Sequence, residues 1–308
     1  MKDSILLIIK ELDTKTIEEL DSYFIPALPA PYAIRVILYK FSCSILLYKE
    51  QIILHDNAED LHQFRINIRK SRAFLKEFSF LFPKEQQSHF SKSLKKIASK
   101  TNHKRDLDVI KEQLLKFNTS QKMIQKEIKE EQMREYKKIQ KMLKNRSFSH
   151  FFLLYRNTLK SKTGLAPKYQ TVRIKDTAKK VIQSLYHEIL IKIDALEKGI
   201  DEKNLHKIRI SFKKLRYLLE EFQHILGEEK VEKMIKDGKK VQTLLGEFND
   251  TVNQKKLLHN YLTSNKDHIP KRGKLERVLL KETLQRQEKL LLQAKKKLFK
   301  FRNKEITL

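Results

Sequence analysis

Apolar residues recur at helical spacing along most of the chain. Between residues 34 and 52, apolar side chains recur every three or four positions and give one wide buried face; they include Ile34, Ile37, Leu38, Phe41 and Ile45. The chain has only six glycines and six prolines, and the prolines fall between the periodic segments. This pattern predicts an all-α protein.

The same periodicity predicts where the helices lie. We expect helices over residues 32–54, 61–82, 87–103, 107–117, 120–143, 148–159, 177–197, 205–222, 228–245, 251–262 and 274–301. Asp56 with Glu59 predicts a capping box for the helix at 61–82, and Asp201 with Glu202 places negative charge at the start of the helix at 205–222. Residues 1–33 form a separate extension, with a short helix expected over 5–12 and a proline-rich linker over 26–31.

One segment of the sequence occurs twice. LHQFRINIRKSRAFLKEF begins at Leu61 and LHKIRISFKKLRYLLEEF at Leu205, and the two copies agree at nine aligned positions. Spacing beyond the copies also repeats, because a Lys-Lys pair follows each histidine by 33 and 34 residues and an aspartate follows it by 44. We therefore expect an internal duplication, with one repeat at about 34–167 and the other at about 168–308.

Each copy places basic residues on one side of its helix. At about 100° per residue, five residues of the first copy fall within a stripe roughly 80° wide that borders the apolar face. These are His62, Arg65, Arg69, Arg72 and Lys76, and His206, Arg209, Lys213 and Arg216 repeat the arrangement. Like charges three or four residues apart destabilise a helix, and guanidinium groups fit phosphate oxygens in pairs. The stripes predict a phosphate-like anion site, in preference to a solvated charged face.

Composition agrees with an anionic partner without selecting one. The chain carries 66 Lys and Arg against 38 Asp and Glu, a formal charge of +28. So basic a domain indicates nucleic acid, an anionic membrane or polyphosphate as partner. The chain contains no run of 18 apolar residues, so no membrane span is predicted, and no signal peptide is expected. We expect a cytoplasmic protein in which Cys43, the single cysteine, is a packed core residue.

The sequence does not predict catalysis. It has no Gly-rich phosphate loop and no nucleophile elbow. His62 and His206 have basic neighbours that would repel a metal cation, so we expect them to donate to phosphate or to orient the arginines. Asp106 and Asp250 are expected to cap helices or to hold a basic residue. We therefore predict no enzymatic activity, no cofactor and no metal.

The repeated motif resembles the CHAD family, the conserved histidine α-helical domain. Each half of that family carries an H-x-x-R-x-x-x-R/K-x-x-R helix, a lysine-bearing helix and an R/N-D turn, and the resemblance runs from about residue 34 to the end. It implies two pseudo-symmetric four-helix bundles that bind inorganic polyphosphate through basic residues at a groove or pore between the repeats. The expected ligands are His62, Arg65, Arg69, Arg72, Lys76, Lys92, Lys95, Lys96, His206, Arg209, Lys213, Arg216, Lys236, Lys239 and Lys240.

Two alternatives use the same basic residues. Single-strand binders stack bases on aromatic side chains, whereas the aromatic residues near the stripes are expected on the packing side; they are Phe64, Phe74, Phe78, Tyr217 and Phe222. Nonspecific nucleic-acid binding is therefore expected to be weak. The other alternative is a basic scaffold for acidic proteins or for polyphosphate granules, and oligomeric state is not predicted.

Overall fold

A computed structural model describes residues 12, 15–22, 25–116, 122–161, 169–264 and 272–303. Within these residues the chain is helical apart from turns and one isolated bridge, which confirms the predicted all-α class. The chain divides into two compact units. Unit 1 comprises the described residues of Met1–Arg105, Gln132–Val181 and His224–Leu226, and unit 2 those of Asp106–Glu131, Ile182–Gln223 and Gly227–Leu308.

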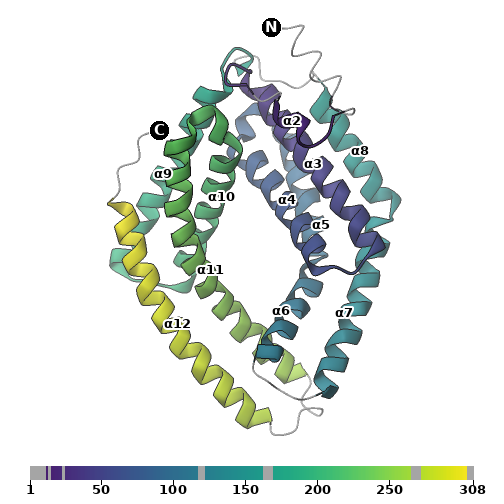
Figure 1. Cartoon of the computed structure of the whole chain (residues 1–308), viewed down its shortest axis with the longest axis vertical. Coiled ribbons are helices and arrows are strands. Elements are labelled where there is room, and N and C mark those ends of the chain that lie inside the picture. The colour runs from purple at the N-terminus through teal and green to yellow at the C-terminus, as the bar shows by residue number, and fades with distance from the viewer. Residues whose placement is uncertain are drawn as a thin grey trace. The chain divides into compact units, whose positions relative to one another are not determined.

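Unit 1 is built around α3 and α4. Its helices are α2 (Glu19–Ser22), α3 (Ala30–Leu54), α4 (Ala58–Glu77), η1 (Ser79–Leu81), α5 (Lys84–Ser99), the start of α6 (Asn102–Lys116), the second half of α7 (Lys122–Leu143), α8 (Arg146–Lys160) and the start of α9 (Ile174–Asp194). α3 packs along α4 and against α8, while α4 also packs on α5 (Figure 1).

Aromatic rings fill the core of unit 1. Phe41 meets Phe74 edge to face, with ring centroids 5.4 Å apart, and Phe90 meets Tyr155 at 4.8 Å. These four side chains are at most 2% exposed, so each contributes on the order of 2 kcal/mol of hydrophobic stabilisation. α4 is therefore held on one face by a rigid core, which leaves its basic stripe at the edge of that face.

α3 is the one helix among the described residues that is long and apolar enough to cross a membrane. Its most apolar 18-residue window has a mean hydropathy of 1.3, and 67% of that window is buried inside the protein. The fully buried Arg35 donates from Nη1 to the carbonyls of Thr158, at 3.3 Å, and of Ser161. Burial lowers the pKa of Arg35 to about 10. Arg35 therefore ties α3 to the C-terminal end of α8.

A short bridge closes unit 1. Pro29 and Arg173 pair in antiparallel fashion, and the Ala30 amide donates to the Val172 carbonyl at 2.9 Å. The Ile174 amide donates to the Leu28 carbonyl at 2.8 Å. These bonds fix the start of α3 beside the start of α9.

Unit 2 contains the remainder of α9 and the C-terminal helices. Its further elements are η3 (Ala195–Lys198), α10 (Glu202–Leu226), α11 (Glu228–Ser264) and α12 (Arg272–Arg302). α11 and α12 lie side by side over much of their length (Figure 1). Phe212 and Phe301 meet edge to face at 4.8 Å and are both buried, so α10 is held against α12 as α4 is held by the aromatic core of unit 1.

The two basic helices begin at different kinds of cap. Asn57, and not Asp56, caps α4, because its Oδ1 accepts the Glu59 amide at 2.9 Å. Asp56 instead lies 3.2 Å from the buried Lys104 Nζ, so the predicted Asp56–Glu59 capping box is wrong. Asp201 caps α10 by accepting the Asn204 amide at 2.6 Å.

Several predicted boundaries also change. α4 ends at Glu77, and Pro83 precedes α5, which ends at Ser99. α6 begins at Asn102, well before the predicted start at 107. α11 is one continuous helix where two were predicted, 228–245 and 251–262. The predicted helix over 5–12 lies outside the described residues except for Leu12, and the expected boundary at 164–167 lies wholly outside them.

Candidate functional site

The basic stripe of α4 lies at the rim of the helix's buried face. His62, Arg65, Arg69 and Arg72 are half-buried and Lys76 is exposed, whereas Leu61, Phe64, Ile68 and Leu75 are buried in the core. The arginines are therefore partly desolvated but still accessible. Charged groups in this position interact with a ligand more strongly than fully solvated ones do.

Arg65 holds the corner between α5 and α6. Its Nη1 donates to the Ala98 carbonyl at 3.0 Å and to the Thr101 hydroxyl, while Nη2 donates to Asn102 Oδ1 at 2.9 Å. Three of its five N–H donors therefore bind the protein itself. Arg65 positions the lysine-bearing helix, with little donor capacity left for a ligand.

Arg72 and Arg69 form the uncompensated part of the stripe. Burial lowers the pKa of Arg72, and the positive charge of Arg69 lowers it further. Arg72 Nε is buried without a hydrogen-bond partner among the described residues, and no described carboxylate pairs with either guanidinium. An anion between the two side chains would satisfy both the charge and the donor.

Only one of the three predicted lysines of α5 lines a groove. All three are exposed. Lys96 lines a groove beside α8, whereas Lys92 and Lys95 are not among the residues that line it. At about 100° per residue, Lys96 lies about 40° from Lys92 and about 100° from Lys95 around the helix. The prediction that all three lysines contribute to one anion site stays a prediction.

In unit 2, the His206 ring contacts another side chain of the same unit. The Nδ1 of its exposed ring lies 2.7 Å from Asn249 Oδ1, on α11. Because that oxygen accepts, Nδ1 carries the proton, and Nε2 then donates to a phosphate only when the ring is charged. The expectation of a satisfied histidine that orients its neighbours fits this contact better than that of a neutral phosphate donor.

The other basic residues of α10 lie near carboxylates of unit 2. Arg209 Nη2 is 3.8 Å from Asp250 Oδ1, and Arg216 Nε is 3.3 Å from Glu220 Oε1. Asp250 therefore holds a basic residue, as one of the two predicted roles required. It caps no helix, because it lies inside α11, and Asp106 likewise lies inside α6.

The three predicted lysines of α11, Lys236, Lys239 and Lys240, are exposed. Lys236 pairs with Glu232 at 2.8 Å, one turn earlier in the helix. Lys240 lines a small pocket of about 120 Å³ together with Lys297 and Lys300 of α12. The two α12 lysines were not predicted, because the repeat that led to the other residues does not include them.

The structure thus places each predicted residue on α4 and α5 of unit 1 or on α10 and α11 of unit 2. The positioning residues Thr101, Asn102 and Asn249 were missed; their polar side chains close to the repeated Lys-Lys and Asp positions were the available signal. No cluster of three or more His, Cys, Asp or Glu suited to a metal occurs within the described residues. Cys43 is half-buried on α3.

Comparison with known proteins identifies the family. The sequence profile of the CHAD domain matches residues 42–259. The crystal structure of the CHAD domain from the plant Ricinus communis superimposes with a TM-score of 0.73 at 20% identity, covering 92% of this chain and 94% of that chain.

A second solved structure, PptA from Streptomyces chartreusis, gives a TM-score of 0.64 at 13% identity and covers 88% of this chain and 97% of that one. No curated protein matches the sequence. At such identities the two structures support the fold alone, whereas the profile spans most of the chain. The chain therefore belongs to the CHAD domain family, a family associated with polyphosphate binding.

Proposed function

We propose that this protein binds inorganic polyphosphate through two basic helix pairs, α4 with α5 and α10 with α11. The observation that carries the proposal is the Arg69–Arg72 pair, whose charges are partly desolvated and have no carboxylate partner among the described residues. Such a pair destabilises the unliganded helix and is relieved by an anion. Lys92 and Lys95 are exposed on α5, which packs on α4, and they add positive charge to the same unit.

The aromatic residues support polyphosphate over single-stranded nucleic acid. Phe64, Phe74, Phe78 and Phe222 are fully buried, and Tyr217 is 2% exposed. None of these rings is available to stack on a base, which is the main source of affinity in general single-strand binders. Phosphate contacts alone remain, and polyphosphate offers them at higher density than nucleic acid.

The proposal is for binding without catalysis. The arginines and lysines of the stripes hold charge and donate hydrogen bonds, and the mechanism needs no proton transfer from His206, whose Nδ1 is engaged by Asn249. The sequence-based expectations of a cytoplasmic location and of one groove formed by both halves stay predictions.

A parallel titration tests the proposal. Fluorescent long-chain polyphosphate and duplex DNA are titrated with the full chain at about physiological salt, where nonspecific DNA binding has a Kd of about 10⁻⁴–10⁻⁶ M. We expect polyphosphate to bind more tightly than that range and to displace DNA. Displacement of polyphosphate by DNA at equal phosphate concentration would overturn the proposal.

A further inference from the structure

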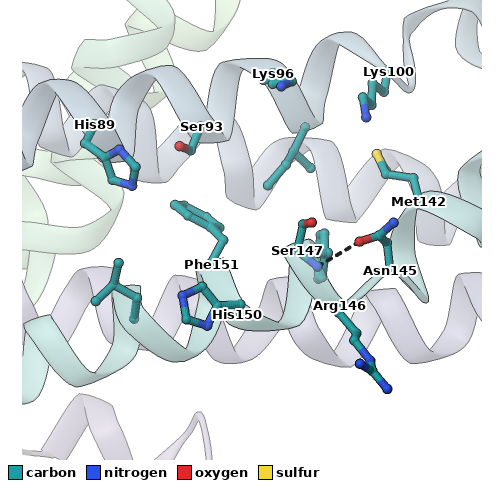
Figure 2. Close-up of a pocket in the computed structure, with 13 residues that line it drawn as sticks. His89, Ser93, Lys96, Lys100, Met142, Asn145, Arg146, Ser147, His150 and Phe151 are labelled. Atoms are coloured by element: carbon teal, nitrogen blue, oxygen red, sulfur yellow. Dashed lines mark hydrogen bonds between the residues drawn. The ribbon is translucent and has the colours of Figure 1, made fainter.

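A groove in unit 1 lies apart from the Arg69–Arg72 pair. It has a volume of about 800 Å³ and runs between α5 and α8, with the end of α7 at one extremity (Figure 2). The apolar lining comes from Ile97, Met142, Phe148, Phe151 and Leu154. His89 and Lys100 mark its length on α5, about 16 Å or three helical turns.

The apolar floor of the groove is preformed. The Phe151 ring stacks on Tyr155 with an interplanar angle of 10° and centroids 5.8 Å apart, and it meets Phe152 edge to face at 5.1 Å. Both of these partners are buried. A floor held in this way keeps its shape without a ligand, which lowers the entropic cost of binding one.

The rim of the groove carries positive charge only. Lys96 and Lys100 of α5 and Arg146 of α8 are exposed lining residues, and no Asp or Glu lines the groove. None of the three cations has an ion pair among the described residues. His89 and His150 lie at the other end (Figure 2), where they add polar contact at neutral pH.

Both walls present side chains at helical spacing. His89, Ser93 and Lys96 of α5 and Lys100, its C-cap, follow one another at intervals of three or four residues, as do Ser147, His150 or Phe151, and Leu154 on α8. Two ridges of this kind, about three turns long on the α5 side and about two turns long on α8, form the complement of one helix that packs between them. Leu154 is 46% exposed at the open side of the groove.

We propose that this groove is a docking site for an amphipathic, acidic helix of a partner protein. Apolar side chains at i, i+3 or i+4 and i+7 would pack on Phe151, Leu154 and Ile97, while Glu or Asp beside them would pair with Lys96, Lys100 and Arg146. The site is separate from the proposed polyphosphate surface. It would give the protein a second ligand, recognised through apolar contact as well as charge.

A designed peptide tests the proposal. The probe is a fluorescein-labelled 15-residue helix with Leu at i, i+3, i+4 and i+7 positions and Glu elsewhere, compared with a scrambled peptide of the same composition. With the full chain we expect saturable binding, a gain of helicity by circular dichroism, and at least about tenfold weaker binding of the scramble. Equal binding of the two peptides would overturn the proposal, because it would reflect charge alone.

Matched variants locate the binding surface. Leu154→Glu and Lys96→Glu should each weaken the peptide complex about tenfold. Leu153→Glu, at an exposed position on the same helix but outside the groove lining, and Lys95→Glu should change it less than about twofold. If Leu153→Glu or Lys95→Glu weakens the complex as much as its partner variant, docking in the groove is wrong.

Polyphosphate separates the two proposals. A saturating amount of it should leave at least part of the helical peptide bound, and Lys95→Glu should weaken polyphosphate more than peptide. If polyphosphate displaced all of the bound peptide at equal concentration of negative charge, the proposal of a separate site would be wrong. Dodecyl phosphate is added as a small amphiphilic anion. If it binds the groove while the peptide does not, a lipid-like ligand replaces the helix and the proposal fails.

Discussion

The basic helices of the two units differ in how their charge is compensated. In unit 1, burial and the nearby charge of Arg69 lower the pKa of Arg72, and no described carboxylate pairs with either guanidinium. In unit 2, Asp250 lies beside Arg209, Glu220 beside Arg216, and Glu232 beside Lys236. A ligand reaching unit 2 must therefore compete with existing ion pairs.

For Arg216, this difference arises at one position of the repeated motif. Lys76 of α4 is aligned with Glu220 of α10, so the fourth turn carries a cation in one copy and a carboxylate in the other. Arginine–carboxylate pairs near a surface contribute at most about 1 kcal/mol. That energy is enough to lower the affinity of the second helix several-fold, and we expect unit 1 to contribute more of the polyphosphate affinity.

Reversing one charge in each stripe should have the largest effect. We expect the Arg69→Glu, Lys213→Glu double variant to bind polyphosphate at least about 100-fold more weakly, because each change replaces an attraction by a repulsion. Filter binding measures the affinity, and thermal melting followed by circular dichroism is the control. The fold should stay intact, since fewer like charges remain on each helix. Loss of folding would indicate that these residues are structural.

Removing Arg65 should affect stability rather than affinity. Arg65→Ala removes the Arg65 donor from Asn102 Oδ1 and from the buried Thr101 hydroxyl, while the Ala98 carbonyl keeps its bonds from Thr101, so we expect a loss of about 2 kcal/mol in the free energy of unfolding. Urea denaturation measures it. The matched variant Arg216→Ala removes a half-exposed ion pair and should cost less than about 1 kcal/mol. Equal losses would refute the positioning role of Arg65.

Exchanging the charges at positions 76 and 220 should reverse the contributions of α4 and α10 to polyphosphate affinity. We expect Glu220→Lys to strengthen polyphosphate binding about threefold by releasing Arg216, and Lys76→Glu to weaken it by a similar factor. Isothermal titration at two salt concentrations measures both. The changes should shrink as salt rises. A stronger effect of Arg216→Ala than of Arg72→Ala on binding would reverse the assigned ranking of the two units.

The smallest effect concerns the continuity of α11. A Cβ at Gly246 would meet no atom within 4 Å, so Gly246→Ala should stabilise the protein by about 0.5–1 kcal/mol through helix propensity alone. Differential scanning calorimetry measures the shift. The same substitution at Gly227, where φ is +106°, serves as the opposite control and should destabilise the protein.

The sequence predicted the helical class and the basic helices because their periodic signals are strong. It missed the continuity of α11, because Gly246 and Asn249 read as a turn. Val241, Leu245, Phe248 and Val252 are all buried and keep one helical period across that stretch, so tertiary packing outweighs the weak local propensity. This unbroken period was the available signal.

The site was predicted in its residues and less well in their roles. Lys95 and Lys96 look equivalent as a pair, yet adjacent helical residues point about 100° apart, and of the two only Lys96 lines the groove beside α8. The three bonds made by Arg65 depend on the short turn at residues 100–101 between α5 and α6, whose geometry no single-sequence pattern specifies. Asp56 and Asn57 are both good caps. The choice between them depends on Lys104, which forms an ion pair with Asp56.

The bridge between residues 28–30 and 172–174 has a consequence for synthesis. Its hydrogen bonds join the start of α3 to a stretch that the ribosome makes only after α4, α5 and α8 have been completed. During translation the start of the apolar α3 therefore lacks these hydrogen bonds until the start of α9 has been synthesised. We expect a ribosome-bound chain halted before residue 172 to be cleaved near Ala30 by protease, and one halted well beyond α9 to resist.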